Sequence, residues 1–508
     1  MKKSMTRVLA VLLSVLSLAV ALCGCTGDKK GNSNTSITIG IAQDNEETLD
    51  PHNMVAAGTK EIFFNVFEGL VKPDSDGNII PAVASDYTVS EDGLTYTFTI
   101  REGVKFHDGT LVTAEDVQYS MSKCADIEGG NPMIPALLNI ASVDIVDDAT
   151  VNIVLKEADN DFLANIATVP AAIIPKHNDD PSGNAIGTGP YKYVSRAPLE
   201  NVVFERNDDY WGEKPEIAHV TFKICSSADT ISMELEGGSI DMMAHLTNAQ
   251  KMQINTENFE IYSGTMNLVQ ALYLNHNVEP FDNEDVRKAM CYAIDKDAIL
   301  GFVSDGDGVK IGSSMYPNFR KYYDASLADA YPHDVEKAKE LLKKAGYENG
   351  FSFDITVPSN YTQHVDTATV LKEQLAEVGI TANIKLVDWD TWLSDTYIGR
   401  NYDATVIGVD AAQLSASSLL ARFVSDAGNN FTNYNNPDYD DLYNEAFTNL
   451  DAETQTEQFK GCLQLLSDDA ANVYIQDLPE FVALNKKFTG YTFYPVYVID
   501  VAKIMPAE

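Results

Sequence analysis

Hydrophobic and polar residues alternate at every second position in parts of the first third of the chain, a period that predicts β-strands. Residues 86–100 contain two such runs on either side of Asp92-Gly93, and residues 143–155 repeat the arrangement around Asp147-Asp148. Between these two hairpins, Thr113-Ala-Glu-Asp116 has the spacing of a helix capping box. The first half is therefore expected to form small β-rich units with one solvated face.

Beyond about residue 280 the apolar residues recur at the three- and four-residue spacing of α-helices. Helices are predicted over residues 335–345 and 365–378, each ending at a glycine, and strands over residues 351–357 and 380–386. A strand, a helix and a strand in this order form a βαβ unit, which requires parallel pairing and a right-handed crossover. A further buried strand is predicted at residues 402–409, so the second half is expected to be an α/β domain.

Two apolar, strand-like runs bracket this α/β domain, at residues 268–274 and 481–484. A domain inserted in this way is entered and left by two chain crossings. Two neighbouring crossings form a hinge, and a hinge suits closure around a ligand.

The first thirty residues have the order of an export signal. Lys2, Lys3 and Arg7 precede an apolar run over residues 8–22, and Leu22-Cys23-Gly24-Cys25 closes it. This ending resembles a bacterial lipobox, in which the second cysteine becomes the acylated first residue of the mature protein. We therefore expect residues 1–24 to be a lipoprotein signal peptide, Cys25 to carry the lipid, and residues 25–36 to be a flexible tether.

Charge and length narrow the possible functions. The chain has 75 acidic and 36 basic residues, a formal net charge of −39, so nucleic acid is excluded as a partner because its phosphates would be repelled. A cationic ligand is mildly favoured, although acidic surfaces commonly serve solubility. At 508 residues the chain is too long for one core and should form two or more domains. From residue 37 onward no apolar run is long enough to cross a membrane.

The spacings of common catalytic and metal-binding motifs do not occur in the chain. Gly-x-Ser-x-Gly, His-Glu-x-x-His and the P-loop are missing, so we expect no enzyme, no metal and no cofactor. His107 lies beside a turn without a neighbouring nucleophile and is expected to be a hydrogen-bonded structural residue. Cys124, Cys225, Cys291 and Cys462 are far apart in sequence, which favours buried free thiols and assigns no disulfide.

A set of short motifs occurs in a fixed order over most of the chain. Together they resemble the extracytoplasmic solute-binding proteins of ABC importers in the peptide/nickel-binding family, which includes oligopeptide- and dipeptide-binding proteins. The motifs are Thr48-Leu-Asp-Pro-His52, Phe67-Glu-Gly-Leu70, Leu94-Thr-Tyr-Thr-Phe98, Val104-Lys-Phe-His-Asp-Gly109, Thr113-Ala-Glu-Asp-Val117, Gly187-Thr-Gly-Pro-Tyr191, Asn207-Asp-Asp-Tyr-Trp211, Phe281-Asp-Asn-Glu-Asp-Val-Arg287 and Ala293-Ile-Asp295.

The resemblance implies an α/β, two-lobed periplasmic-binding-protein fold with parallel or mixed sheets, a hinge and an extra β-rich domain. It places lobe I at residues 37–63, 185–270 and 485–508, the extra domain at 64–184 and lobe II at 271–484. It further implies a monomer, anchored by lipid to the extracytoplasmic face of the cell membrane, that captures an oligopeptide or peptide-like solute and delivers it to an ABC permease and its ATPase subunits.

The resemblance also implies a ligand site. In the family's peptide binders, the backbone after the Asp-Pro pair contacts the peptide main chain, a tryptophan at the position of Trp389 lines the pocket, and an aspartate binds the peptide ammonium. Here Val409 and Ala412 depart from the family pattern around that aspartate, and Asp410 lies two residues early. The expected ligand-binding residues are Met54, Val55, Ala56, Ala57, Trp389, Asp410, Ala411, Ala412 and Gln413.

Several alternatives stay open from sequence. Of Trp389 and Trp392, three positions apart, we expect one in the core and the other, Trp389, at the cleft. The missing aspartate disfavours an unmodified dipeptide, because a buried ammonium without a partner is costly. The same scaffold could bind an oligosaccharide or a metal chelate, and a surface hydrolase or a signalling receptor are the alternatives from other classes of protein.

Overall fold

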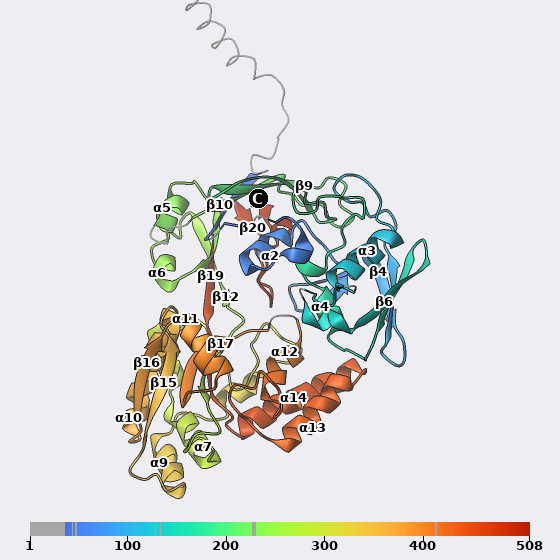
Figure 1. Cartoon of the computed structure of the whole chain (residues 1–508). Helices are drawn as coiled ribbons and strands as arrows, with labels where there is room; N and C mark the ends of the chain where they lie inside the picture. Colours follow the sequence, from blue (N-terminus) through green and yellow to red (C-terminus); the bar gives the residue numbers. More distant parts are fainter. Residues whose placement is uncertain are drawn as a thin grey trace, which may run out of the picture. The chain divides into compact units, whose positions relative to one another are not determined.

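A computed structural model of the chain describes residues 36–507, apart from residues 43, 46–47, 128, 133, 226–229 and 412–413 (Figure 1). The predicted signal peptide, the tether and the lipidation site Cys25 lie outside the described residues. Ala412 and Gln413 of the predicted ligand site lie outside them as well.

Within the described residues, a seven-stranded sheet forms the base of the part that we name lobe I. β1 at its centre is parallel to both of its neighbours, whereas the other pairs are antiparallel. The helix α2 (Ala57–Phe63) packs Ile62 and Phe63 into its core. In spatial order the strands are β12 (Phe259–Thr265), β19 (Pro479–Asn485), β11 (Met242–Leu246), β1 (Ser36–Ile41), β10 (His219–Ile224), β9 (Asn201–Arg206) and β8 (Tyr191–Ala197).

A four-stranded antiparallel sheet lies in what we call the extra domain, over the described part of residues 64–184. The strands β4 (Ala84–Val89) and β5 (Thr95–Ile100) form the first predicted hairpin, and β6 (Ile140–Asp147) and β7 (Thr150–Leu155) form the second. Both hairpins are confirmed. Thr113 and Asp116 make the predicted capping box at the start of α3 (Ala114–Cys124).

A six-stranded mixed sheet, counted over the described residues, forms lobe II. The predicted βαβ unit is confirmed as far as its elements and its parallel pairing. Its helix α10 (Thr362–Glu377) and the preceding α9 (Val335–Lys344) are followed by Gly379 and Gly346, whose φ angles are +85° and +89°. In spatial order the strands are β14 (Val309–Lys310), β18 (Val473–Asp477), β13 (Val269–Leu274), β17 (Ala404–Val409), β15 (Ser352–Pro358) and β16 (Thr381–Val387).

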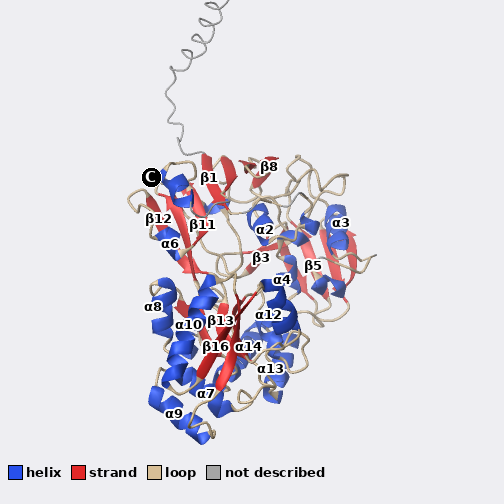
Figure 2. Cartoon of the chain, turned by 60° about the vertical axis from the view of Figure 1, so that its left-hand side comes forward, coloured by secondary structure: helices blue, strands red, loops and turns tan. Residues whose placement is uncertain are grey.

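Helices cover both faces of this second sheet (Figure 2). Alternate residues of β13 enter different cores: Val269, Ala271 and Tyr273 pack on one side, and Leu272 and Leu274 on the other. A strand covered on both faces is mainly apolar, which explains why five of the six residues of β13 are hydrophobic and Gln270 is the exception. The first core includes α12 (Ala416–Leu420), α13 (Pro437–Thr448) and α14 (Ala452–Asp468), and the second includes α7 (Glu284–Ala293), α9 and α10.

The chain passes between the two sheets at two neighbouring places, as predicted. β12 leads to β13 across residues 266–268, and β18 leads to β19 across Leu478. The amide of Met266 donates a 2.8 Å hydrogen bond to the carbonyl of Leu478, so the two crossings lie side by side. Figure 1 shows β12 and β19 extending together from lobe I toward this point.

The sequence prediction misplaced both ends of this insertion. It gave residues 479–484 to lobe II, but β19 pairs with β11 and β12 in lobe I. It also gave Val269 and Gln270 to lobe I, although they pair with Val409 and Gly408 in lobe II. An apolar strand pattern indicates burial and does not tell which sheet the strand joins. The other domain limits stay a prediction.

None of the helices in the described part combines the length and apolar composition that crossing a bilayer requires. The four cysteines of the described residues are buried and free, as predicted.

The remaining elements are short. The other helices are α4 (Phe162–Ile166), α5 (Ile231–Glu236), α6 (Asn248–Lys251), α8 (Lys296–Ser304), α11 (Trp389–Thr391) and a π-helix at Trp392–Ile398. Short 3₁₀ turns lie at Pro51–Asn53, Pro135–Asn139, Val169–Ala171, Ala325–Asp329, Ala421–Phe423 and Val501–Lys503. Two-strand pairs join β2 (Val71–Pro73) to β3 (Ile79–Pro81), and β20 (Phe488–Thr489) to β21 (Met505–Pro506).

Candidate ligand-binding cleft

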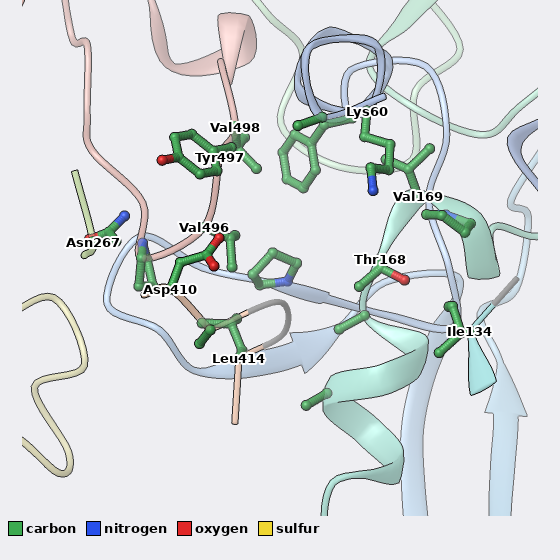
Figure 3. Close-up of a pocket in the computed structure, with 18 of the residues that line it drawn as sticks. Lys60, Ile134, Thr168, Val169, Asn267, Asp410, Leu414, Val496, Tyr497 and Val498 are labelled. Carbon is green, nitrogen blue, oxygen red and sulfur yellow. The ribbon is translucent and has the colours of Figure 1, made fainter. Parts of the chain in front are cut away.

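A cleft of about 450 Å³ lies where lobe I, lobe II and the extra domain meet (Figure 3). This volume is within the range of sites for small molecules. Its lining residues are Met54, Val55, Ala57, Lys60 and Phe64 around α2, Pro495, Val496, Tyr497 and Val498 near the C-terminus, Pro73, Ile134, Pro135, Ala164, Ala167, Thr168, Val169 and Pro170 from the extra domain, Tyr316, Asp410, Ala411 and Leu414 from lobe II, and Asn267 at the crossing.

The segment before α2 is fixed from behind by Asp50 and His52. The Asp50 carboxylate accepts hydrogen bonds from the His52 amide at 3.1 Å and from Lys123 Nζ at 2.7 Å. His52 Nε2 lies 2.8 Å from the carbonyl of Ala172, and burial lowers the pKa of His52 to about 4, so its ring is neutral. The Asp-Pro-His motif therefore attaches the segment that begins at Met54 to the extra domain.

Of the predicted residues in this segment, Met54, Val55 and Ala57 line the cleft. Val55 is 63% exposed, a large fraction for an apolar side chain beside a cleft. Ala56 precedes α2 with an extended backbone, at φ −65° and ψ 131°. The structure brings this segment and the predicted loop residues Asp410 and Ala411 to the same cleft.

Lys60 and Asp410 are the two charged residues among the described lining residues. Lys60 extends from α2 into the cleft, and Asp410, which follows β17, lies on the opposite side (Figure 3). Neither side chain makes a hydrogen bond or an ion pair with another described residue. Arg422 donates a hydrogen bond to the main-chain oxygen of Asp410 and leaves its carboxylate unengaged by the described residues. The rest of the lining is mainly apolar, so the cleft presents one positive and one negative group across an apolar space.

Two tyrosines of the cleft lie near the Asp410 carboxylate. Burial raises the pKa of Tyr316 and of Tyr497, and the negative charge of Asp410 raises both further. Both hydroxyls therefore stay protonated and remain hydrogen-bond donors. Tyr316 donates to the carbonyl of Pro495 at 3.4 Å and thereby connects lobe II with the C-terminal segment.

Tyr497 also contacts a charged cluster behind the cleft, formed by His245, Glu61 and Glu480. His245 Nε2 lies 2.7 Å from Glu61, and its Nδ1 lies 2.7 Å from Glu480. Although burial lowers the pKa of His245, the two carboxylates outweigh that effect and raise it well above its ordinary value. The ring centroids of His245 and Tyr497 are 5.8 Å apart. No feature of the sequence indicated this cluster, because Glu61 and His245 are more than 180 residues apart.

The tryptophan pair divides between core and surface. Trp392 is buried and donates from Nε1 to Thr405 at 2.9 Å, whereas Trp389 is 37% exposed. Trp389 stacks on Trp392, with centroids 5.1 Å apart, and contacts the edge of Tyr361. It is not among the residues described as lining the cleft, so its role in ligand binding stays a prediction.

Metal-ligating side chains do not cluster in the described part of the chain. It contains no group of three His, Cys, Asp or Glu side chains arranged to hold a metal ion. His107 is structural, as predicted: its Nε2 lies 3.0 Å from the carbonyl of Gly189, and its Nδ1 accepts from the Gly187 amide. Burial lowers the pKa of His107 to about 4.

Comparison with known proteins identifies the family. Residues 78–431 match the model of the bacterial extracellular solute-binding proteins, family 5. This chain belongs to that family. The dipeptide-binding protein of Escherichia coli (strain K12) is 29% identical to this family 5 protein, and the match covers 82% of this chain and 84% of the relative. The oligopeptide-binding protein AppA of Bacillus subtilis (strain 168) is 26% identical, with 96% of each chain covered.

Solved structures agree with this assignment. The ABC transporter substrate-binding protein CtaP of Listeria monocytogenes matches this family 5 protein with a TM-score of 0.81 at 26% identity, covering 93% of this chain and 99% of CtaP. The two-lobed, mixed α/β periplasmic-binding-protein fold expected from sequence is thereby confirmed. The two relatives are named for the binding of dipeptides and oligopeptides, and CtaP is named as a substrate-binding protein of an ABC transporter.

Proposed function

We propose that this protein binds a peptide or peptide-like solute in the cleft, without altering it, and delivers it to an ABC permease and its ATPase subunits. The observation that carries the proposal is the pair of opposite charges, Lys60 and Asp410, on facing sides of an apolar cleft. A peptide with free ends carries two opposite charges separated by a partly apolar body. The names of the relatives as dipeptide- and oligopeptide-binding proteins support the same class of ligand.

The paired crossings near Met266 and Leu478 support a mechanism of hinge closure. Lobe I contributes Lys60 to the cleft, and lobe II contributes Asp410. A ligand that contacts both groups stabilises the conformation in which the lobes are closest, so binding shifts the population toward closure. A permease that contacts both lobes would then distinguish the loaded protein from the empty one.

The proposal includes a lipid anchor at Cys25, which would hold the monomer at the extracytoplasmic face of the cell membrane. Its support is the order of basic residues, apolar run and lipobox-like ending in residues 1–25. Substitution Cys25→Ser should abolish incorporation of labelled palmitate and release the protein from membrane fractions. Retention of the label by the variant would contradict the anchor.

Ligand identity can be tested by mass spectrometry of the solute that co-purifies with the full-length protein. We expect unmodified peptides, together with a smaller radius of gyration in X-ray scattering when they are added back. Recovery of sugars alone would favour the oligosaccharide alternative, and recovery of a chelated metal would favour the chelate. Accumulation of cleaved products would indicate a hydrolase instead.

A further inference from the structure

Lys60 is the single positively charged residue among the described residues that line the cleft. It lies in the middle of α2, and its partly buried side chain extends into the cavity (Figure 3). The carboxylate next to it in sequence, Glu61, is engaged by His245 at 2.7 Å. The nearest acidic residue along the chain is thus already paired, and Lys60 makes no ion pair with any other described residue.

We propose that Lys60 binds the carboxylate of the ligand, so that a free C-terminal carboxylate is a requirement for tight binding. This inference rests on the proposed function, since it specifies which peptides the cleft accepts. The ligand would lie with its carboxylate at Lys60 on lobe I and its ammonium toward Asp410 on lobe II. The carboxylate end is the new element, because the sequence indicated a candidate residue for the ammonium end alone.

The apolar surroundings give this contact its selectivity. Val55, Val169, Pro170 and Val498 line the same cleft, and a bound ligand would displace water from these surfaces. In a less polar environment an ion pair becomes stronger, while a charge without a partner becomes more costly. A neutral sugar or an amidated peptide would leave the Lys60 ammonium desolvated without a counter-charge.

The other polar groups of the cleft do not replace Lys60. Tyr316 and Tyr497 stay protonated and neutral, and Thr168 and Asn267 carry no charge. The hydroxyls of Tyr316 and Tyr497 already donate to main-chain carbonyls, and none of these groups can neutralise a carboxylate. Because Lys60 and Asp410 belong to different lobes, a zwitterionic ligand would form an ion pair with each lobe. A ligand with one charge would form an ion pair with one lobe alone.

The test uses the full-length protein in detergent, stripped of bound solute, and two mixtures of di- to pentapeptides. One mixture has free C-terminal carboxylates, and the other contains the same sequences as C-terminal amides. Captured peptides are identified by mass spectrometry, and the affinities of the best acid and of its amide are measured by calorimetry. We expect the acid to bind the wild-type protein roughly 10- to 100-fold more tightly than the amide, the usual range for a charge-assisted hydrogen bond.

Variants assign this preference to Lys60. Lys60→Met should reduce the acid-to-amide ratio to about one, Lys60→Arg should retain most of it, and Lys339→Met, on the exposed face of α9, should leave it unchanged. Equal binding of acid and amide by the wild-type protein would overturn the role of Lys60 and leave peptide binding intact. The same conclusion would follow if Lys60→Met kept the preference. Failure of the wild-type protein to capture either mixture would overturn the proposed function, and this inference with it.

Discussion

The amide of Leu268 donates a 2.9 Å hydrogen bond to the Oδ1 atom of Asp477, so a carboxyl group from one chain crossing holds the backbone of the other. Asp477 is fully buried at the end of β18, and its second oxygen has no hydrogen-bond partner among the described residues. The two crossings therefore enclose an acidic group that water does not reach. This arrangement makes the hinge sensitive to the charge of one residue.

We predict that Asp477→Asn stabilises the protein at alkaline pH. Burial raises the pKa of Asp477 to about 8, against about 3.9 for an unfolded aspartate. The folded state thus binds more protons than the unfolded state between these values, and wild-type stability falls as the pH rises from about 4 to about 8. The asparagine does not ionise and can still accept from Leu268, so its advantage should grow over this interval to the order of 2 kcal/mol.

Thermal unfolding at pH 5, 7 and 9 measures this effect. Asp426→Asn, at an exposed position of the same lobe, serves as the control and should change the melting temperature by the same small amount at each pH. A melting temperature of Asp477→Asn that shows no pH-dependent gain over the wild-type protein would contradict the prediction.

In the charged cluster behind the cleft, a substitution should lower stability instead of raising it. The carboxylates of Glu61 and Glu480 raise the pKa of His245, so its stabilising contribution is complete below about pH 6.5 and is lost as the pH rises through the folded pKa. His245→Gln should therefore lower stability more at pH 6 than at pH 10. Because the side chain is 40% exposed, solvent screening limits the loss to about 1–2 kcal/mol.

Denaturant unfolding at the two pH values tests the role of His245. His219→Gln, at an exposed histidine of β10, removes the same type of side chain without breaking a side-chain contact described in the structure. If the stability of His245→Gln and of His219→Gln changed with pH in the same way, the ion pairs of His245 with the two carboxylates would not stabilise the protein.

The extra domain contacts lobe II through Asn160. Its Nδ2 donates to the carbonyls of Phe447 and Asn449, at 2.7 and 2.6 Å, and the neighbouring Asp161 accepts from Ser417. Asn160→Ala removes both donors and should weaken the contact by about 1–3 kcal/mol. We expect faster amide hydrogen exchange over residues 447–451, since this segment would separate more often from the extra domain.

The control for this contact is Asn444→Ala, on an exposed turn of α13. That substitution should leave exchange over residues 447–451 near the wild-type rate. Unchanged exchange in Asn160→Ala would show that the two hydrogen bonds do not hold the extra domain to lobe II.

A further prediction concerns Glu68, from the Phe67-Glu-Gly-Leu70 motif. Its buried carboxylate accepts from Trp211 Nε1 at 2.7 Å, from Tyr210 at 2.8 Å and from Lys72 at 2.7 Å. Glu68→Gln would place an amide group among these donors and leave one of them without an acceptor. Removing one partner of a buried, charged network should destabilise the protein by about 2–4 kcal/mol.

Chemical denaturation of Glu68→Gln measures this loss, with the exposed Glu102→Gln as the matched control. Glu102 makes no side-chain contact described in the structure, so its replacement should change stability by less than about 0.5 kcal/mol. Similar midpoints for the two variants would show that the motif glutamate is not structural.

Local elements were predictable because neighbours in sequence decide them. The turn at Asp92-Gly93, the capping box at Thr113 and the helix ends before Gly346 and Gly379 depend on a few adjacent residues. The alternating and helical periods likewise identified both hairpins and the βαβ unit. The order of the motifs indicated the family and the two-lobed fold, which the comparisons confirm.

The sheet to which a strand belongs could not be predicted in the same way. Residues 481–484 of β19 form an apolar run like that of β13, yet β19 pairs in lobe I and β13 in lobe II. An apolar run reports that a strand is buried, and the pairing partners come from chain segments at least 130 residues away. This is why the predicted boundary at residue 484 was wrong.

The sequence by itself determined the secondary structure, the family, and the segments around Met54 and Asp410 that reach the cleft. Only the tertiary structure placed Lys60 across an apolar space from Asp410 and enclosed His245 between Glu61 and Glu480. The physical reason is the separation in sequence over which each kind of interaction acts. Periodicity and capping act over a few residues, whereas the partner of a charge is decided by which distant segments the packed cores bring together.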